Sequence, residues 1–306
     1  MRQRVVTSFF LVSIFFGGCS QSGSRASSGA DATTDASIPA SLDGQSLPIE
    51  AVLVVNSGAA DALHSAVDAL TARCMTQHGL TYVAYPEDRI RSNPFDLVTR
   101  YGHISIGSAS EFGYHSPQAS VLQAFDKSIA EIDTRRERIS SVYNDLLYGS
   151  TRADGCYSAA VKDIYGQSNG ASGMGGYQQL VDLQATGSQK ALGERAVVDA
   201  MKSWSTCMAS VGYTYPTIYA AKGPFPSSET DRTPPSTEER KQAVADARCR
   251  SESKVELILF ATESRIETDL LDLNTELVTN FKKQMDDAVT RAQRLVSGRA
   301  SPTTNT

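Results

Sequence analysis

Apolar side chains recur every three or four positions along two long stretches of the chain. The first stretch follows Pro117 and continues to Leu146, with Arg136 in one place where an apolar residue is expected. The second runs from Leu259 to Leu295, with charged residues between its apolar positions. A period of three or four residues places these side chains on one face of a helix. The pattern therefore predicts two long amphipathic helices, which we expect to pack against each other and against the shorter cysteine helices.

A nine-residue pattern occurs twice and marks the ends of two further helices. Residues 74–82 match residues 207–215 at five positions, which are Cys, Met, Gly, Thr and Tyr. We call each copy a Cys-Met repeat. Apolar positions at helical spacing lead into both copies, and Gly79 and Gly212 stand where a left-handed C-terminal cap is needed. Each repeat is therefore predicted to end a helix that carries a cysteine.

The N-terminus has the pattern of an export signal. A short basic start precedes an apolar segment, residues 5–16, of about a dozen residues, whereas a bilayer span needs roughly 20. The following Phe16-Gly17-Gly18-Cys19 resembles the lipobox of bacterial lipoproteins, although the usual Leu three positions before the cysteine is Phe16 here. We expect cleavage before Cys19 and a lipid on its thiol, which would hold the protein at the extracytoplasmic face of the cell membrane. The alternative is an ordinary secretory signal cleaved near Gly18.

Four cysteines remain when Cys19 is set aside. They are Cys74, Cys156, Cys207 and Cys249. In a chain that leaves the reducing cytosol the default expectation is two disulfides, for which three pairings exist. Since one further cysteine follows each Cys-Met repeat, the economical pairing is Cys74 with Cys156 and Cys207 with Cys249, one bond in each half.

These features predict a mainly α fold, a disulfide-stapled helical bundle built from two related halves with little or no sheet. Residues 51–55 fit either one short strand or the start of a helix.

Serine, alanine and glycine dominate the segment after Cys19, which predicts a disordered tether. The expected organisation is a signal peptide at 1–18, the lipidated cysteine and tether at 19–47, a first helical half at 48–166, a Gly-rich linker at 167–189, a second helical half at 190–297 and a disordered tail at 298–306.

The order of these features resembles a group of uncharacterised secreted lipoproteins of high-GC Gram-positive bacteria. The resemblance covers nearly the whole mature chain. It rests on the lipobox and polar tether, two Cys-Met-x-x-x-Gly-x-x-Tyr copies, Tyr148-Gly149 before Gly155-Cys156, residues 243–246 before Cys249, and a closing long helix. It implies a helical build with paired cysteines and implies no activity.

Charge and composition narrow the choice of partners. The formal net charge of the chain is −5, and removing the signal also removes Arg2 and Arg4. A mildly acidic chain without a cluster of lysine and arginine argues against nucleic acid or anionic lipid as a partner. The expected membrane contact is therefore the lipid on Cys19.

No familiar catalytic or metal-binding motif is present. Cys74 and His78 have the i, i+4 spacing of two metal ligands on one helix face, but a disulfide at Cys74 would consume the thiolate. The chain has no G-x-S-x-G elbow, and its Gly-rich stretch lacks the Lys-Ser/Thr of a phosphate loop. We therefore expect no catalytic residue, no metal and no cofactor.

Tyrosines supply the one indication of binding. They are Tyr82, Tyr85, Tyr213, Tyr215 and Tyr219, all just after the two cysteine helices. A tyrosine can stack on a sugar ring or anchor a protein partner through its flat face and hydroxyl. The alternative is that these rings cover the disulfides and fill the ends of the bundle.

The sequence thus favours a non-catalytic binding or scaffolding protein of the cell envelope. Its partner would be a cell-wall polymer or an envelope protein. Two alternatives remain open at this point, an envelope enzyme of the hydrolase class with an unrecognised site and a carrier of a small ligand or metal.

Overall fold

The computed structural model describes residues 38–86, 100–149, 154–225, 231 and 233–299. The predicted signal peptide, Cys19 and the tail after residue 299 lie outside the described residues. Every described helix belongs to one compact unit.

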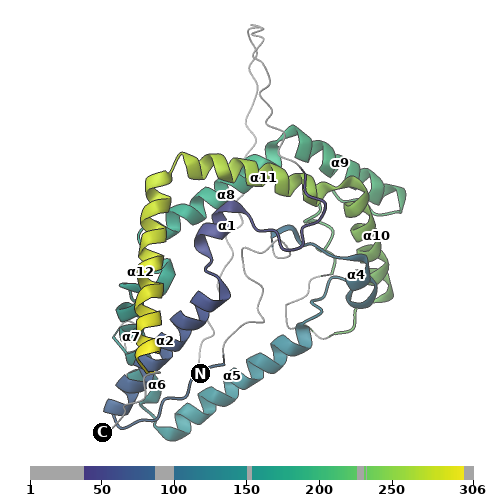
Figure 1. The fold of residues 1–306 in the computed structure, drawn as a ribbon. Coiled ribbons are helices and arrows are strands. Elements are labelled where there is room, and N and C mark those ends of the chain that lie inside the picture. Colours follow the sequence, from purple (N-terminus) through teal and green to yellow (C-terminus); the bar gives the residue numbers. More distant parts are fainter. Residues whose placement is uncertain (1–37, 87–99, 150–153, 226–230, 232, 300–306) are drawn as a thin grey trace, which may run out of the picture. The chain divides into compact units, whose positions relative to one another are not determined.

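Within the described ranges the regular structure is helical and contains no strand, which confirms the mainly α prediction (Figure 1). Residues 51–55 belong to a helix up to Leu53 and are extended at Val54. The elements are α1 (Pro48–Leu53), α2 (Ser57–Gln77), α4 (Ile106–Phe112), α5 (Ala119–Ile139), α6 (Tyr143–Tyr148), α7 (Cys156–Tyr165), the short 3₁₀ helix η1 (Gly170–Gly173), α8 (Tyr177–Gly193), α9 (Arg195–Ser210), α10 (Thr237–Ser253), α11 (Val255–Asp272) and α12 (Thr275–Arg299).

The largest core lies where α12 and α7 pack on α2. Figure 1 shows α12 alongside α2. On α12 the buried face includes Phe281 and the small Ala288 and Ala292, which allow the two helices to approach closely. Opposite them, α2 buries Leu63 and Val67. Each large side chain of this kind contributes about 1.5–3 kcal/mol when it leaves water.

A further core joins α9, α10 and α11. Trp204 of α9 is fully buried, and its indole nitrogen donates to Asp246 Oδ1 of α10 at 2.9 Å. Arg250 of α10 is also buried and donates to Asp246 at 2.7 Å and to Glu256 at 2.6 Å. Because each charge is paired, this part of the core tolerates buried polar groups.

Both predicted long helices are interrupted, and they do not pair with each other. Ser140 is extended and ends α5, so the first stripe is divided between α5 and α6. The second stripe bends between α11 and α12, where Leu273 is 82% exposed. The prediction that the two long helices pack together is wrong, because α12 packs on α2 and α7 whereas α5 contacts mainly α6.

The predicted boundaries between halves also need correction. Residues 177–189, assigned to the Gly-rich linker, form most of α8, and Leu180 is fully buried in the main core. Leu47, at the end of the predicted tether, is fully buried against α11 residues such as Leu259. The helices of residues 48–166 and 190–297 share one core, since α12 packs on α2.

Both disulfides have the predicted pairing. Cys74–Cys156 joins α2 to α7, and Cys207–Cys249 joins α9 to α10, each with a Cα–Cα distance of 5.6 Å. That distance is typical of a disulfide. The bonds confirm the stapled helical bundle that the repeats predict.

None of the described helices combines the length and the apolar character that are needed to cross a membrane.

Candidate binding site: a tyrosine-lined pocket beside the first disulfide

A pocket of about 630 Å³ lies among α2, α6 and α7 of the described chain. Small-molecule sites commonly measure about 300–1,000 Å³. Five tyrosine rings contribute to its wall, which are Tyr82, Tyr85, Tyr148, Tyr157 and Tyr165. The remaining wall includes aliphatic residues of α2 and α7 and the segment 168–171.

Helix α7 presents one face to this pocket. Tyr157, Val161 and Tyr165 are spaced by four residues, so they stand one above another along the helix. The helix begins at Cys156, directly before this face, and Gly155 precedes it. A Cβ on Gly155 would lie 2.3 Å from the backbone nitrogen of Gly149. Glycine at this position therefore permits the close backbone approach that seats the start of α7.

The segment after the first Cys-Met repeat supplies Tyr82 and Tyr85. Gly79 has a φ of +76°, which turns the chain back from the end of α2. The Tyr82 hydroxyl then donates to Asp68 Oδ1 at 2.8 Å, and the Tyr85 hydroxyl donates to Asp133. Asp68 also lies 3.3 Å from His64 Nε2. These contacts fix both rings at the pocket wall.

Arg136 lies beneath these rings and is only 1% exposed. Its Nε donates to the carbonyl oxygen of Val83 at 3.0 Å, and its Nη1 donates to the Tyr148 hydroxyl at 3.2 Å. The guanidinium carbon stands 3.8 Å from the centre of the Tyr85 ring, in cation–π geometry. The arginine that interrupts the apolar stripe of α5 is thus a buried support of the pocket.

The phenols of Tyr82, Tyr157 and Tyr165 are neutral at pH 7. Burial, followed by the hydrogen bond to Asp68, raises the pKa of Tyr82 above its ordinary value of 10.0. Burial also raises the pKa values of Tyr157 and Tyr165. These hydroxyls therefore act as hydrogen-bond donors and acceptors rather than as nucleophiles.

Four polar side chains of the wall have no hydrogen-bond partner among the residues that the structure describes. They are Tyr157, Tyr165, Ser168 and Asn169. Tyr157 is 40% exposed, so its ring is accessible from solvent. The pocket therefore offers free neutral donors and acceptors next to aromatic faces.

The tyrosines expected to form one binding surface occupy separate places. Tyr82 and Tyr85 line the pocket, whereas Tyr213 and Tyr215 donate to Glu238 at 3.0 Å and Gln242 at 2.9 Å on α10. Tyr219 is 44% exposed elsewhere, and burial of its hydroxyl together with the charge of Glu263 raises its pKa to about 12. The structure therefore brings two of the five predicted tyrosines together.

Tyr148, Tyr157 and Tyr165 also belong to the site, but they were not predicted from the sequence. The spacing of Tyr157, Val161 and Tyr165 was visible as one helix face, and Arg136 stood out as a charge in an apolar stripe. The positions of α6 and α7 against α2 were not visible in either pattern, because they depend on tertiary packing.

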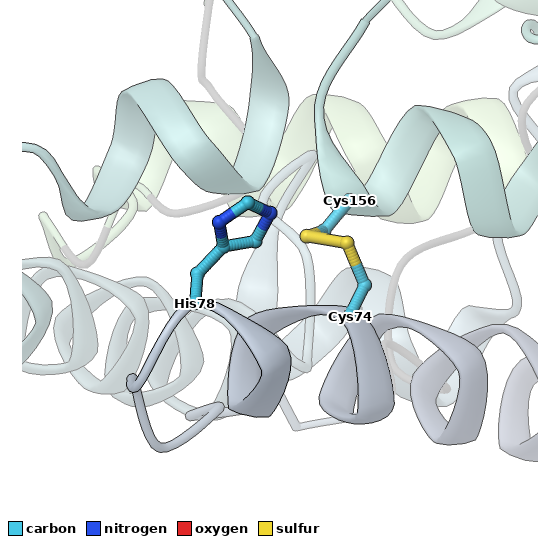
Figure 2. Close-up of side chains that lie close together, drawn as sticks. All are labelled: Cys74, His78 and Cys156. Atoms are coloured by element: carbon cyan, nitrogen blue, oxygen red, sulfur yellow. A yellow bond between two sulfur atoms is a disulfide. The ribbon is translucent and has the colours of Figure 1, made fainter.

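The Cys74, His78 and Cys156 side chains gather at the first disulfide, with potential ligand atoms within 4.8 Å of one another (Figure 2). The two sulfur atoms are bonded to each other. A metal would need them as thiolates, so in this state only the His78 ring remains as a ligand of the set.

A separate acidic cluster is buried where α1 meets α11. Glu263 accepts from the Tyr101 hydroxyl at 2.6 Å and pairs with Arg100, while Glu267 accepts from the backbone nitrogen of Ile49 at 2.9 Å. Burial, together with the charge of Glu263, raises the pKa of Glu267 to about 7. These contacts tie the start of α1 to α11 and are structural.

Comparison with protein-family models, with curated proteins and with solved structures found no match for this chain.

Proposed function

We propose that this chain is a non-catalytic binding protein of the cell envelope, and that the tyrosine-lined pocket is its binding site. The observation that supports this most directly is the pocket itself, in which five rings and four free polar groups line one cavity of about 630 Å³. Apolar walls with a few polar groups are typical of ligand sites. A wall polymer or an envelope protein would enter through the exposed edge at Tyr157.

The contacts in the pocket favour binding over catalysis. The carboxylate of Asp68 accepts from Tyr82 and lies beside His64. Among the described residues of the wall, the Ser168 hydroxyl has no hydrogen bond to a base that would activate it. A nucleophile without such a base is weak. The groups present are suited to holding a ligand.

The first disulfide supports the same role. Cys74–Cys156 joins α2 to α7, and both of these helices contribute residues to the pocket wall. A wall fixed before the ligand arrives loses less conformational entropy on binding. The disulfide therefore preorganises the site.

The proposed anchoring rests on the N-terminal sequence. The lipobox-like Phe16-Gly17-Gly18-Cys19 follows a signal core, and a polar segment leads from Cys19 to the buried Leu47. A flexible chain of that length reaches roughly 30 Å. The tether would hold the pocket away from the lipid headgroups.

Binding is tested with the full mature protein and Tyr157→Leu. Thermal unfolding is measured with isolated cell-wall polymer and with one soluble probe for each ligand class. A ligand that occupies the pocket raises the unfolding temperature, because it binds the folded state alone. We expect a rise that Tyr157→Leu abolishes and that the matched control Tyr219→Leu keeps. No rise with any ligand would contradict the proposed binding role.

Anchoring is tested by fractionating cells that express the natural chain or Cys19→Ala. We expect the natural chain in the membrane fraction, with the mass of an attached diacylglyceryl group, and Cys19→Ala in the soluble fraction. A Cys19→Ala chain that still fractionates with membranes would refute lipid anchoring.

A further inference from the structure

The chemistry of the tyrosine-lined pocket distinguishes among classes of ligand. The charged groups at its wall are already paired within the protein. Asp68 is engaged by Tyr82 and His64, while Arg136 donates to the carbonyl of Val83 and lies 3.7 Å from Asp133. Because a buried charge needs a partner, an anionic or cationic ligand would have no unpaired countercharge at this wall.

The aromatic surface that could attract a cation is also partly occupied. The guanidinium of Arg136 covers one face of Tyr85 at 3.8 Å and lies 5.9 Å from the ring of Tyr143. A ligand ammonium group would be repelled by this charge. The protein's own cation therefore already occupies one face of an aromatic ring at the pocket wall.

The remaining groups are neutral and of two kinds. Rings of Tyr157 and Tyr165 offer flat apolar faces, and their hydroxyls, with Ser168 and Asn169, are free to donate and accept. An acyl chain covering these groups would leave them without partners, which is unfavourable. A pyranose ring can contact both the flat ring faces and the free polar groups, because its C–H face is apolar and its rim carries hydroxyls.

We infer that the pocket binds a neutral carbohydrate, with a sugar ring on the α7 tyrosines and its hydroxyls bonded to Ser168 and Asn169. This inference rests on the proposed binding function of the pocket and names its ligand class. A cavity of about 630 Å³ is within the range of sites for small ligands, so a short oligosaccharide or the end of a glycan fits.

Isothermal titration calorimetry with the full mature protein tests this inference. The neutral probes are maltotriose, cellotriose and mannotriose, and the competing classes are represented by choline and octanoate, all up to millimolar concentration. We expect at least one trisaccharide to bind. Stacking on an aromatic ring is worth roughly a tenfold change in affinity, so Tyr157→Leu should weaken that binding about tenfold.

Two variants locate the contact. Tyr165→Phe keeps the ring and removes a hydroxyl, so we expect a smaller loss, roughly three- to tenfold, the usual effect of one hydrogen bond. Tyr219→Leu, of similar exposure but outside the pocket, should bind as the natural chain does. Unchanged near-ultraviolet circular dichroism shows that each variant is folded.

The outcomes separate this inference from the proposed function. Binding of choline or octanoate that depends on Tyr157, with no trisaccharide bound, would overturn the carbohydrate assignment and leave the pocket as the binding site. A trisaccharide whose binding is lost in Tyr219→Leu and kept in Tyr157→Leu would overturn the location. If no probe of any class binds at the pocket, the inference and the proposed function both fail.

Discussion

The chain around Cys74 and the chain around Cys207 end their helices with the same hydrogen bonds. Leu80 N donates to Met75 O at 3.0 Å, and the equivalent Tyr213 N donates to Met208 O at 2.9 Å. Both methionines are fully buried, and the glycine of each repeat has a positive φ. This pattern is a Schellman-type helix end, and the two Cys-Met repeats are therefore equivalent in local structure.

The surroundings of the two repeats differ. Three residues before Cys207, Trp204 fills the core and bonds to Asp246, whereas three residues before Cys74 the smaller Thr71 bonds only to Val67 O of its own helix. The final tyrosine also differs, since Tyr82 lines the pocket and Tyr215 is bonded to Gln242 of α10.

The accessible surfaces at the two disulfides are also unlike. A groove of about 520 Å³ lies over Cys207–Cys249, but its wall has one tyrosine, Tyr213, and several charged residues, among them Lys241, Arg248 and Glu252. Neither Cys74 nor Cys156 lines the tyrosine-lined pocket, whose wall is aromatic and has its charges paired. The same local motif thus lies beside an aromatic pocket in one place and a packed core in another, according to the helices that pack beside it.

The largest expected effect is a loss of stability that differs between the two regions. Trp204→Ala removes a fully buried indole and its bond to Asp246, so we expect a loss of about 5 kcal/mol in the free energy of unfolding. Tyr157→Leu in the first region should change it by less than about 0.5 kcal/mol. Urea denaturation measures both, and equal losses would contradict the contrast between filled core and open pocket.

Removing each disulfide in turn tests whether only one of the two regions binds the ligand. By chain entropy, Cys74→Ala with Cys156→Ala and Cys207→Ala with Cys249→Ala should each cost about 4 kcal/mol, since the bonds close loops of 82 and 42 residues. We expect only the first double variant to lose ligand affinity, because only that bond joins two helices of the pocket wall. Calorimetry under conditions where both double variants are folded measures their ligand affinities. Equal affinities in the two variants would contradict the expected difference.

The free energy of unfolding should also depend on pH. The titrating group, Glu267 of α11, lies in neither of the two regions, so the dependence should be the same whichever disulfide is removed. The pKa of Glu267 is raised from 4.5 to about 7, so the folded state holds a proton that the unfolded chain releases. The free energy of unfolding should therefore fall as the pH rises from about 4.5 to about 7, by at most roughly 3 kcal/mol. Glu267→Gln should flatten this dependence in the natural chain and in both disulfide variants. An unchanged slope in Glu267→Gln would show that another group is responsible.

The smallest expected effect comes from removing the hydroxyl of the last tyrosine in each repeat. Tyr82→Phe and Tyr215→Phe each remove one hydroxyl hydrogen bond, to Asp68 and Gln242. We expect a loss of about 1 kcal/mol in stability for each, and a change in ligand affinity for Tyr82→Phe alone. A change in affinity for Tyr215→Phe would place part of the site at the second repeat.

The helical fold and the cysteine pairing could be predicted because they follow from local signals. Helical spacing of apolar residues identified the elements, and the two repeats suggested which cysteine belongs with which. The interruptions at Ser140 and Leu273 could not be predicted, because the apolar spacing continues through both positions. Leu273 is part of that spacing and is nevertheless 82% exposed, since the chain bends there to bring α12 onto α2.

The pocket was less predictable than the fold. Tyr82 and Tyr85 were recognised from their place after the first repeat, but nothing in the sequence separated them from Tyr213 and Tyr215. The difference is tertiary, because it depends on whether the neighbouring helix offers a bonding partner such as Gln242 or an open wall. Similarly, α8 was hidden by the Gly-rich residues before it, although Leu180 anchors it in the core.

The most direct test of the difference between the two repeats is fluorine NMR of mature protein labelled with 3-fluorotyrosine. The chain has twelve tyrosines, and single Tyr→Phe variants assign their resonances. On addition of the trisaccharide that binds most tightly, we predict shifts for Tyr82, Tyr85, Tyr148, Tyr157 and Tyr165 and none for Tyr213, Tyr215 and Tyr219. Shifts confined to the tyrosines of the second repeat would contradict the assignment of the binding site to the first.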